Sequence, residues 1–202
     1  MLKRLIALMA ITFSVIVQPV AAAGVLVVGD SLSAGYGIDE REGWVALLRD
    51  RLAERANPVP VINASISGDT TSGGLTRLPA ALDRHRPDIV VIELGGNDGL
   101  RGQSLKNIRK NLSSMVQLVK ESGAEAFLLG MRIPTNYGAR YTQRFFDSFK
   151  QVADEEEVPL VPFFLEGVAT EPNLMQDDGI HPNAEAQPMM LEHVWPAIEG
   201  LL

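Results

Sequence analysis

Ser31 is the side chain best placed for nucleophilic chemistry in this sequence. It lies in Gly29-Asp30-Ser31-Leu32-Ser33, a turn of small residues that directly follows the apolar run Val25-Leu26-Val27-Val28. A serine hydroxyl becomes an effective nucleophile only when a base removes its proton. The pKa of imidazole suits that task near neutral pH, so we expect Ser31 to have a histidine partner.

His181 is the histidine predicted to be that base. It lies in the irregular segment Asp177-Asp178-Gly179-Ile180-His181-Pro182-Asn183, three residues after Asp178. A tight turn would bring both side chains to one side, where Asp178 could hold the imidazole in one orientation and tautomer. Asp177 is the competing carboxylate. The other two histidines are not expected to act as the base. We expect His85 to be a solvated surface group and His193 to be part of the half-buried scaffold.

Negative charge that develops on a carbonyl oxygen during attack needs fixed hydrogen-bond donors. Three groups could supply them. The backbone N–H of Ser31 is expected at the start of a helical turn, where partial positive charge helps. The backbone N–H of Gly68 is accessible because glycine has no Cβ. The side-chain amide of Asn97 can donate, whereas the neighbouring Asp98 would repel an oxyanion.

Asp30, Asp69 and Asp98 are further acidic residues in these segments. The simpler hypothesis is that they cap helices or brace loops. The alternative is a divalent cation held by these three residues with Asp178 and His181, as in a metallohydrolase. No dense ligand motif is present, so we predict neither a metal nor a cofactor.

Apolar runs alternate with amphipathic stretches along the rest of the chain, which predicts alternating strands and helices. The predicted strands are Val25–Val28, Val59–Ile62, Ile89–Leu94, Ala126–Met131 and Val158–Val161, and Glu93 alone interrupts the third. The predicted helices are Trp44–Ala56, Leu75–Arg86, Leu105–Glu121, Tyr141–Glu155 and Pro188–Leu201, the last with a kink at Pro196.

Five strands that alternate with helices predict a parallel sheet covered on both faces. With right-handed crossovers, the expected fold is a three-layer α/β/α sandwich of flavodoxin type, whose five-stranded parallel sheet has the order 2-1-3-4-5. Sites in such sheets lie at the carboxyl ends of the strands. Ser31, Gly68 and Asn97 follow the first three strands, and His181 lies past the fifth, so the candidate residues should collect at that edge.

Four segments, in order, resemble the sequence blocks of the GDSL or SGNH hydrolase family. They are Gly29-Asp30-Ser31-Leu32, the block around Gly68, Gly95-Gly96-Asn97-Asp98 and Asp178-Gly179-Ile180-His181. The resemblance spans the chain after residue 23 and is greatest to a bacterial periplasmic group of the family. It implies Ser31 as nucleophile, His181 as general base and acid, and Asp178 as the carboxylate that orients it. It also implies an oxyanion hole of Ser31, Gly68 and Asn97.

The resemblance further implies a serine esterase and thioesterase that acts through an acyl-enzyme on aryl esters, acyl-CoA-type thioesters and lysophospholipids. By the same analogy the acyl chain lies against Ile133, Pro134 and Tyr137, although plain packing under a long connection is the alternative for that loop. The nearest alternative function is a carbohydrate acetyl esterase of the same family. An alternative from another functional class is a nucleotide-binding module, but no P-loop or Gly-x-Gly-x-x-Gly motif follows a predicted strand. The Gly-x-Ser-x-Gly elbow of α/β-hydrolases is absent too.

Composition narrows the choice of partners. The formal net charge is −7, which argues against nucleic acid and against docking on anionic lipid, since both need a basic face. The chain has no cysteine, which excludes disulfides and zinc–thiolate sites. We expect a monomer that acts on small acyl esters, thioesters or single-chain lipids.

Residues 1–23 have the pattern of a secretory signal peptide. Lys3 and Arg4 precede an apolar run from Leu5 to Val17, which is too short to span a bilayer comfortably, and Ala21-Ala22-Ala23 offers a cleavage site. An uncleaved membrane anchor is the alternative. Cleavage near Ala22-Ala23 would take the net charge from −7 to −9. It would leave residues 24–202 as a single domain, in the periplasm or secreted, with no stable membrane anchor.

Overall fold

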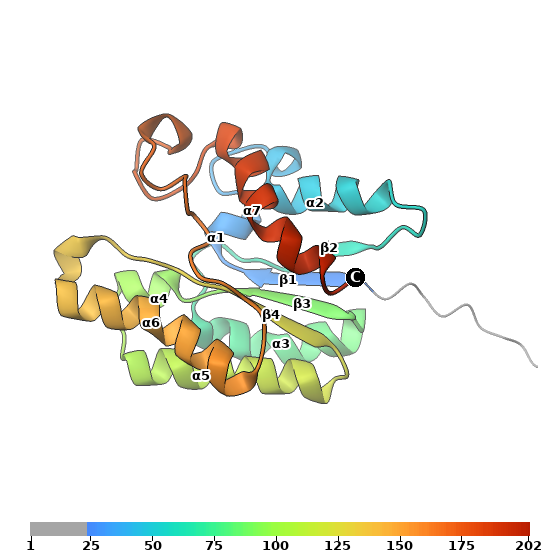
Figure 1. Ribbon diagram of the computed structural model, residues 1–202, viewed down its shortest axis with the longest axis horizontal. Helices are drawn as coiled ribbons and strands as arrows, with labels where there is room; N and C mark the ends of the chain where they lie inside the picture. Colours follow the sequence, from blue (N-terminus) through green and yellow to red (C-terminus); the bar gives the residue numbers. More distant parts are fainter. Residues whose placement is uncertain (1–23) are drawn as a thin grey trace, which may run out of the picture.

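The computed structural model describes residues 24–202, so the predicted signal peptide, residues 1–23, lies outside the described residues. At its centre is a five-stranded sheet with the order β2-β1-β3-β4-β5 (Figure 1). All neighbouring strands are parallel, which confirms the predicted fold class and strand order. The strands are β1 (Val25–Gly29), β2 (Val61–Asn63), β3 (Ile89–Glu93), β4 (Glu125–Leu129) and β5 (Leu160–Val161).

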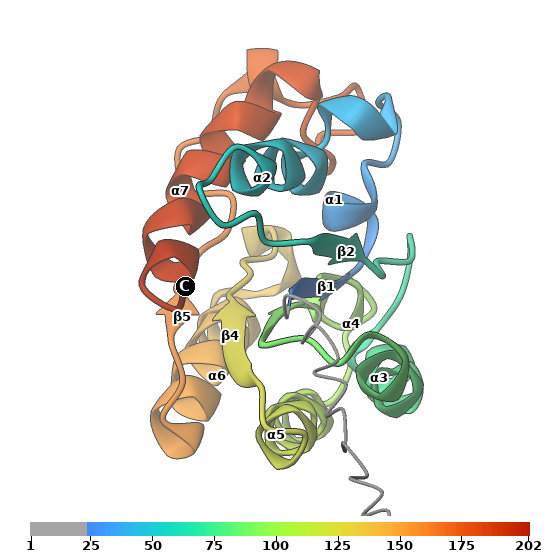
Figure 2. The ribbon, with the colours of Figure 1, turned by 90° about the vertical axis from the view of Figure 1, so that its right-hand side faces the viewer.

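Helices cover both faces of the sheet and give the predicted three layers (Figure 2). One face carries α2 (Trp44–Ala53) and α7 (Gln187–Glu199), and the other carries α3 (Thr71–His85), α5 (Leu105–Glu121) and α6 (Ala139–Glu156). The short helices α1 (Ser31–Ala34) and α4 (Gly96–Leu100) follow β1 and β3. Single 3₁₀ turns lie at Glu40–Glu42, Thr135–Tyr137, Pro172–Leu174 and Ala184–Ala186.

The central strands are continuously apolar because both of their faces are covered. Residues 25–28 of β1 and 89–92 of β3 are buried, as are Trp44 on one face and Phe145 and Phe149 on the other. Burial of these large side chains supplies the hydrophobic stabilisation of the fold. Gly29 pairs with Glu93, so β1 and β3 end side by side and their following turns lie next to each other.

Helix α3 begins at Thr71, four residues before the predicted start at Leu75. The glycines at 73 and 74 do not favour a helix, so the local pattern hides this turn. The Thr70 hydroxyl accepts a hydrogen bond from the Gly73 N–H at 3.2 Å, and the buried Asp98 accepts one from the Thr71 N–H at 2.9 Å. A partner 27 residues away in the sequence therefore helps to extend the helix.

The remaining differences from the predicted elements are small. Helix α4 occupies the glycine-rich segment after β3, which is not among the predicted helices. Helix α2 ends at Ala53 rather than Ala56, and β5 is only two residues long. Helix α7 continues through Pro196 to Glu199. Every other predicted strand and helix is present, and no helix within residues 24–202 is long and apolar enough to cross a bilayer.

Candidate active site

Ser31 lies in a sharp turn between β1 and α1, at the carboxyl end of the sheet. Asp30 caps α1, since its Oδ1 accepts a hydrogen bond from the Leu32 N–H at 3.1 Å. The helix ends at Gly35, whose φ is 72°. Gly29 must lack a side chain, because a Cβ there would lie 2.6 Å from Glu93 Oε2. These constraints hold Ser31 at the first position of a very short helix.

His181 reaches Ser31 from a loop 150 residues further along the chain. The distance from His181 Nε2 to Ser31 Oγ is 2.9 Å, and the distance from His181 Nδ1 to Asp178 Oδ2 is 2.6 Å. Asp178 Oδ1 also accepts hydrogen bonds from the N–H groups of Ile180 and His181, both at 2.9 Å. The structure thus brings Ser31, His181 and Asp178 into one hydrogen-bonded chain, and Asp178 rather than Asp177 makes the contact.

The ionisation of Asp178 determines where the protons lie in the hydrogen-bonded series from Asp178 through His181 to Ser31. Hydrogen bonds from the His181 N–H, the His181 ring and the Ile180 N–H lower the pKa of the Asp178 carboxyl to about 2. An ionised carboxylate can only accept, so His181 Nδ1 donates to it. Nε2 of the neutral ring then carries the lone pair and accepts from the Ser31 hydroxyl, which is the arrangement that removes a proton from serine.

Tyr36 and Gln176 support His181, and the sequence pattern marks neither of them. The Tyr36 ring lies against the imidazole, with centroids 4.5 Å apart and planes inclined by 40°. The Gln176 N–H donates to the His181 carbonyl at 2.8 Å, and Gln176 Nε2 donates to the carbonyls of Tyr36 and Pro182 at 2.7 and 2.9 Å. Gln176 therefore ties together the two loops that meet at the imidazole.

The three candidate oxyanion donors lie at the same edge of the sheet. Within residues 24–202, neither the Ser31 N–H nor the Gly68 N–H donates to another protein group. Gly68 has a φ of 79°, the left-handed conformation that favours glycine. Asn97 Nδ2 donates to Asp30 Oδ2 at 3.0 Å. The Asn97 amide is thereby fixed beside the residue that precedes Ser31.

Arg77 holds the loop that carries Gly68, and sequence reasoning missed it. Its Nε is 2.7 Å from Asp69 Oδ2, its Nη2 donates to the Gly29 carbonyl at 3.1 Å, and its Nη1 donates to the Ala64 carbonyl. One guanidinium therefore joins the end of β1 to the loop after β2. Nothing in the local spacing marks Arg77, because its partners Asp69, Ala64 and Gly29 lie 8, 13 and 48 residues away in the sequence.

The acidic residues Asp69 and Asp98 brace the site, as the simpler hypothesis predicts. Asp69 pairs with Arg77 and also accepts from the Thr70 N–H at 2.8 Å. The buried Asp98 accepts from both the N–H and the hydroxyl of Thr71, at 2.9 and 2.6 Å. No group of three or more histidine, aspartate or glutamate side chains is arranged to hold a metal ion in the described part of the chain.

The other two histidines have structural surroundings. His193 Nε2 is 3.0 Å from the Phe163 carbonyl and the side chain is half-buried, as predicted. His85 is half-buried at the last position of α3 rather than fully solvated. Because α3 starts at the site edge with Thr71, its last residue lies at the opposite end of the sheet.

A comparison with known sequence families agrees with this geometry. The profile of the GDSL-like Lipase/Acylhydrolase family matches residues 27–187. The chain belongs to the GDSL-like lipase/acylhydrolase family. The matched segment contains Ser31, Gly68, Asn97, Asp178 and His181, so the resemblance found in the sequence is confirmed at the level of the family.

Relatives of this family member cover nearly its whole length. It is 54% identical to the esterase TesA of Pseudomonas aeruginosa over 185 residues, 92% of each chain. It is 46% identical to thioesterase 1/protease 1/lysophospholipase L1 of Escherichia coli over 182 residues, 90% of this chain and 86% of the relative. The crystal structure of the psychrotrophic esterase EstA from Pseudoalteromonas, inhibited by monoethylphosphonate, has a TM-score of 0.84 at 41% identity and covers 88% of this chain and 97% of that one.

The residues predicted to bind substrate lie around α4 and α6 of this GDSL-like fold. Ile133 is buried, and its Cγ2 would lie 2.9 Å from a Cβ on Gly99. Pro134 is exposed, and Tyr137 lines a surface cavity of about 440 Å³. No member of the Ser31–His181–Asp178 chain lines that cavity. A substrate-binding role for these three residues therefore stays a prediction.

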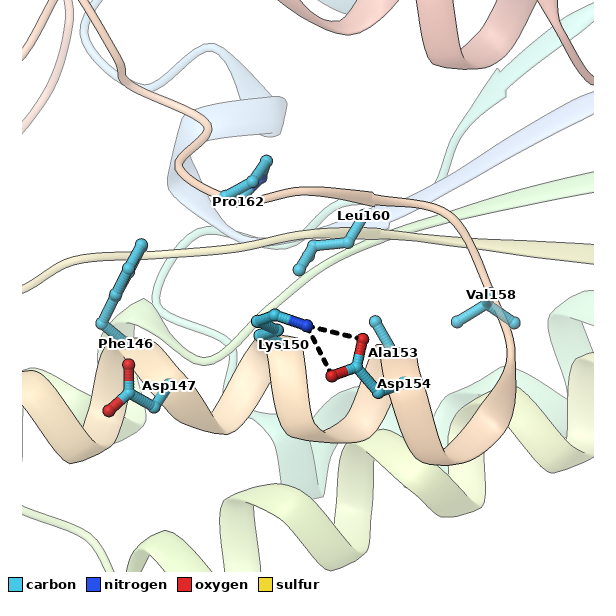
Figure 3. Close-up of a pocket in the computed structure, with 8 residues that line it drawn as sticks. All are labelled: Phe146, Asp147, Lys150, Ala153, Asp154, Val158, Leu160 and Pro162. Carbon is cyan, nitrogen blue, oxygen red and sulfur yellow. Dashed lines mark hydrogen bonds and ion pairs between the residues drawn. The ribbon is translucent and has the colours of Figure 1, made fainter.

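A further cavity of about 360 Å³ lies between α6 and β5 (Figure 3). Phe146, Leu160 and Pro162 line it with apolar surface, and the ion pair of Lys150 with Asp154, at 2.6 Å, lies along its α6 side. None of the candidate catalytic residues lines this cavity, so we assign it no part in the reaction of this family member.

Proposed function

We propose that this protein is a serine hydrolase that cleaves acyl esters and thioesters through an acyl-enzyme intermediate. The observation that carries the proposal is the unbroken chain from Asp178 through His181 to Ser31, with contacts of 2.6 and 2.9 Å. Such a chain supplies a nucleophile, a base and a group that orients the base. Membership of the GDSL-like family and relatives named esterase, thioesterase and lysophospholipase support the same reaction.

In the first half of the reaction, Ser31 Oγ attacks the acyl carbon while its proton passes to His181 Nε2. The imidazolium that forms is stabilised by the ionised Asp178, whose low pKa keeps it charged throughout the working range. His181 then gives the proton to the leaving alkoxide or thiolate. The acyl group remains bound to Ser31 as an ester.

The tetrahedral oxyanion is held by the Ser31 N–H, the Gly68 N–H and the Asn97 amide. Support comes from the two N–H groups, which have no other protein partner within residues 24–202. Further support comes from the hydrogen bond that fixes Asn97 beside Asp30. Loss of one such donor raises the barrier by about 2.7–4 kcal/mol in comparable enzymes.

In the second half of the reaction, water takes the place of the leaving group. His181 removes its proton, the water oxygen attacks the acyl carbon, and the acid departs as Ser31 recovers its hydrogen. The loop that carries Asp178 and His181 is exposed to solvent, so water has access to the imidazole. No metal or cofactor takes part in this scheme.

Aryl esters, acyl thioesters and lysophospholipids are the proposed substrates, with the acyl chain lying toward Ile133, Pro134 and Tyr137. A series of p-nitrophenyl esters and acyl-CoA thioesters of increasing acyl length, run on wild type and Tyr137→Ala, tests this assignment. Loss of the preference for longer acyl chains in the variant is the expected result. A preference for acetylated sugars over medium-chain esters would instead favour a carbohydrate acetyl esterase.

We further propose that residues 1–23 direct export and are removed, and that residues 24–202 act as one domain and as a monomer in the periplasm or outside the cell. The charge and hydropathy pattern of the leader supports export. The relatives also match over most of their own length, which is consistent with a single working unit.

The function is tested most directly at Ser31. Ser31→Ala should fold with an unchanged circular dichroism spectrum and lose at least about 10⁴-fold in turnover of p-nitrophenyl butyrate. Among residues 24–202, no other hydroxyl is hydrogen-bonded to His181. A phosphonate probe should label Ser31 in wild type and leave the variant unmodified. Near-wild-type hydrolysis by Ser31→Ala would overturn the mechanism.

A further inference from the structure

Two carboxyl side chains are buried directly beneath the candidate nucleophile. Asp30 is 2% exposed and Glu93, at the end of β3, is 0% exposed. Within residues 24–202 no lysine or arginine pairs with either of them. Two uncompensated charges in the interior would be strongly destabilising, so the state of this pair needs a physical explanation.

Hydrogen bonds reach only one of the two oxygens of the Glu93 carboxyl within residues 24–202. Its Oε2 accepts hydrogen bonds from the Asp30 N–H at 3.1 Å and from Ser33 Oγ at 2.7 Å. Ser33 Oγ itself accepts from Trp44 Nε1 at 3.2 Å, so the serine proton points to Glu93. Glu93 Oε1 has no hydrogen-bond partner in the part of the chain that the structure describes. The Asp30 carboxyl is close enough for its charge to raise the pKa of Glu93, and two neighbouring carboxyl groups in the interior do not both ionise.

The proton belongs mainly to Glu93. Complete burial, followed by the charge of Asp30, raises the pKa of Glu93 well above its ordinary range. Burial also raises the pKa of Asp30, to about 6, but hydrogen bonds from the Leu32 N–H and Asn97 oppose the rise. Both Asp30 oxygens accept hydrogen bonds, whereas Glu93 Oε1 has no partner within residues 24–202. The geometry therefore also places the single proton of the pair on Glu93 and the negative charge on Asp30 at neutral pH.

The ionised Asp30 determines which way the Asn97 amide faces. Asp30 Oδ1 accepts from the Leu32 N–H and Oδ2 accepts from Asn97 Nδ2. A carboxylate has no hydrogen to give, so Asn97 must turn its NH₂ rather than its oxygen toward Asp30. The second N–H of that NH₂ has no other partner within residues 24–202 and stays available as a donor.

We propose that Asp30 and Glu93 are positioning residues that share one proton, and that through this arrangement Asp30 fixes Asn97 as a hydrogen-bond donor to the oxyanion. The proposal rests on the function proposed above. It gives Asp30 a role beyond capping α1, and it accounts for the acidic residue that interrupts the otherwise apolar strand β3.

Asp30→Asn is the decisive substitution. An asparagine at 30 needs its single oxygen for the Leu32 N–H and so presents NH₂ to Asn97. The Asn97 amide then flips, and its oxygen replaces the donor that faces the oxyanion. Asp39→Asn is the matched control, because Asp39 caps the next turn through the same contact, from the Arg41 N–H at 3.0 Å, and is exposed.

A double-mutant cycle with kcat and KM for p-nitrophenyl butyrate separates positioning from a merely structural role. Asn97→Ala should lower kcat by about 10²–10³-fold, and Asp30→Asn should lower kcat with little change in KM, whereas Asp39→Asn should not. Adding Asp30→Asn to Asn97→Ala should lower kcat by less than about threefold further. Full additivity of the two losses would overturn the proposal, as would wild-type kcat in Asn97→Ala. The inactivity of Ser31→Ala would leave the proposed function standing in either case.

The shared proton is tested at Glu93. Glutamine imitates a protonated glutamic acid, because it is neutral and has one oxygen to accept and an NH₂ to donate, so E93Q should retain most of the activity that Glu93→Leu loses. If these variants do not fold, a spectroscopic measurement on the wild-type protein still tests the shared proton. The infrared spectrum of wild type at neutral pH should contain the carbonyl stretch of a protonated carboxylic acid, and Ser31→Ala should keep it. Absence of that band from wild type, or equal loss of activity in E93Q and Glu93→Leu, would refute the shared proton.

Discussion

Carboxyl groups approach the candidate nucleophile from two sides, and their surroundings are opposite. Asp178 lies in an exposed loop, where three hydrogen bonds lower its pKa to about 2. Asp30 and Glu93 lie beneath Ser31 in the core, where burial raises the pKa of both. The same chemical group is thus a fixed charge on one side and one of a proton-sharing pair on the other.

The difference shows how local surroundings assign a role to each acid. Hydrogen-bond donors favour the charged form of Asp178 and desolvation favours the neutral form of Glu93. A charge at Asp178 is useful because it stabilises the imidazolium formed during attack. Two charges beneath Ser31 would instead oppose the oxyanion. By sharing a proton, Asp30 and Glu93 supply rigid acceptors with only one negative charge.

The largest effect is expected from removing the charge on the exposed side. Asp178→Asn should lower kcat by about 10⁴-fold, because the new amide can donate to His181 Nδ1 and stabilises the tautomer whose Nε2 carries a hydrogen. That tautomer cannot accept the Ser31 proton. Asp177→Asn is the matched control, since Asp177 is an exposed neighbour outside the chain of contacts, and its kcat should stay within about twofold of wild type. Equal activities of the two variants would remove Asp178 from the mechanism.

The two sides also differ in how far they could be predicted from the sequence. His181 and Asp178 are three residues apart in a glycine-containing turn, so their contact was predictable from local pattern and chemistry. The sheet was predictable for a similar reason, because each strand is a separate apolar run with a helix after it. Ser31 was paired with a residue 150 positions away because only one histidine lies in a loop.

The buried side depends on contacts that no local pattern contains. Asp30 meets Asn97 and Glu93 across 67 and 63 residues, and Arg77 meets the Gly29 carbonyl across 48. The start of α3 was missed for the same reason, since Asp98 helps to hold Thr71 from another strand end. The sequence contains one sign of the buried pair, because Glu93 is an acidic residue in an otherwise apolar strand. Its partners could be identified only from the strand register, which places Gly29 beside Glu93.

A second prediction concerns the buried residue Glu93 and the way in which the stability of the protein depends on pH. The folded pKa of Glu93 is raised above 4.5, so the folded state keeps a proton that the unfolded state releases. The protonated Glu93 side chain therefore contributes its full stabilisation below the pKa that glutamate has in the unfolded chain. As pH rises above about 4.5, the free energy of unfolding falls by up to about 1.4 kcal/mol per pH unit, until the raised pKa of folded Glu93 is reached. E93Q cannot titrate at this position and should lack that loss.

Urea denaturation of wild type and E93Q between about pH 4.5 and about pH 7 measures the effect. The free energy of unfolding of wild type should fall relative to that of E93Q across this range. Burial is the largest cause of the raised pKa of Asp30 and should be the same in E93Q, so Asp30 should contribute little to the difference between the two curves. Parallel curves would mean that Glu93 is ionised in the folded protein, and the contrast with Asp178 would disappear.

The smallest expected effect lies again on the exposed side, at Tyr36. Its ring rests on the imidazole of His181 with centroids 4.5 Å apart, a contact worth about 0.5–1.5 kcal/mol for an aromatic pair. Tyr36→Ala should therefore lower kcat for p-nitrophenyl butyrate by about two- to tenfold, because the imidazole gains freedom to turn away from Ser31. Tyr36→Phe keeps the ring and should stay close to wild type. If Tyr36→Phe lost as much as Tyr36→Ala, the hydroxyl would carry the effect. The imidazole would then be held by its hydrogen bonds to Asp178 and Ser31 alone, without help from the ring.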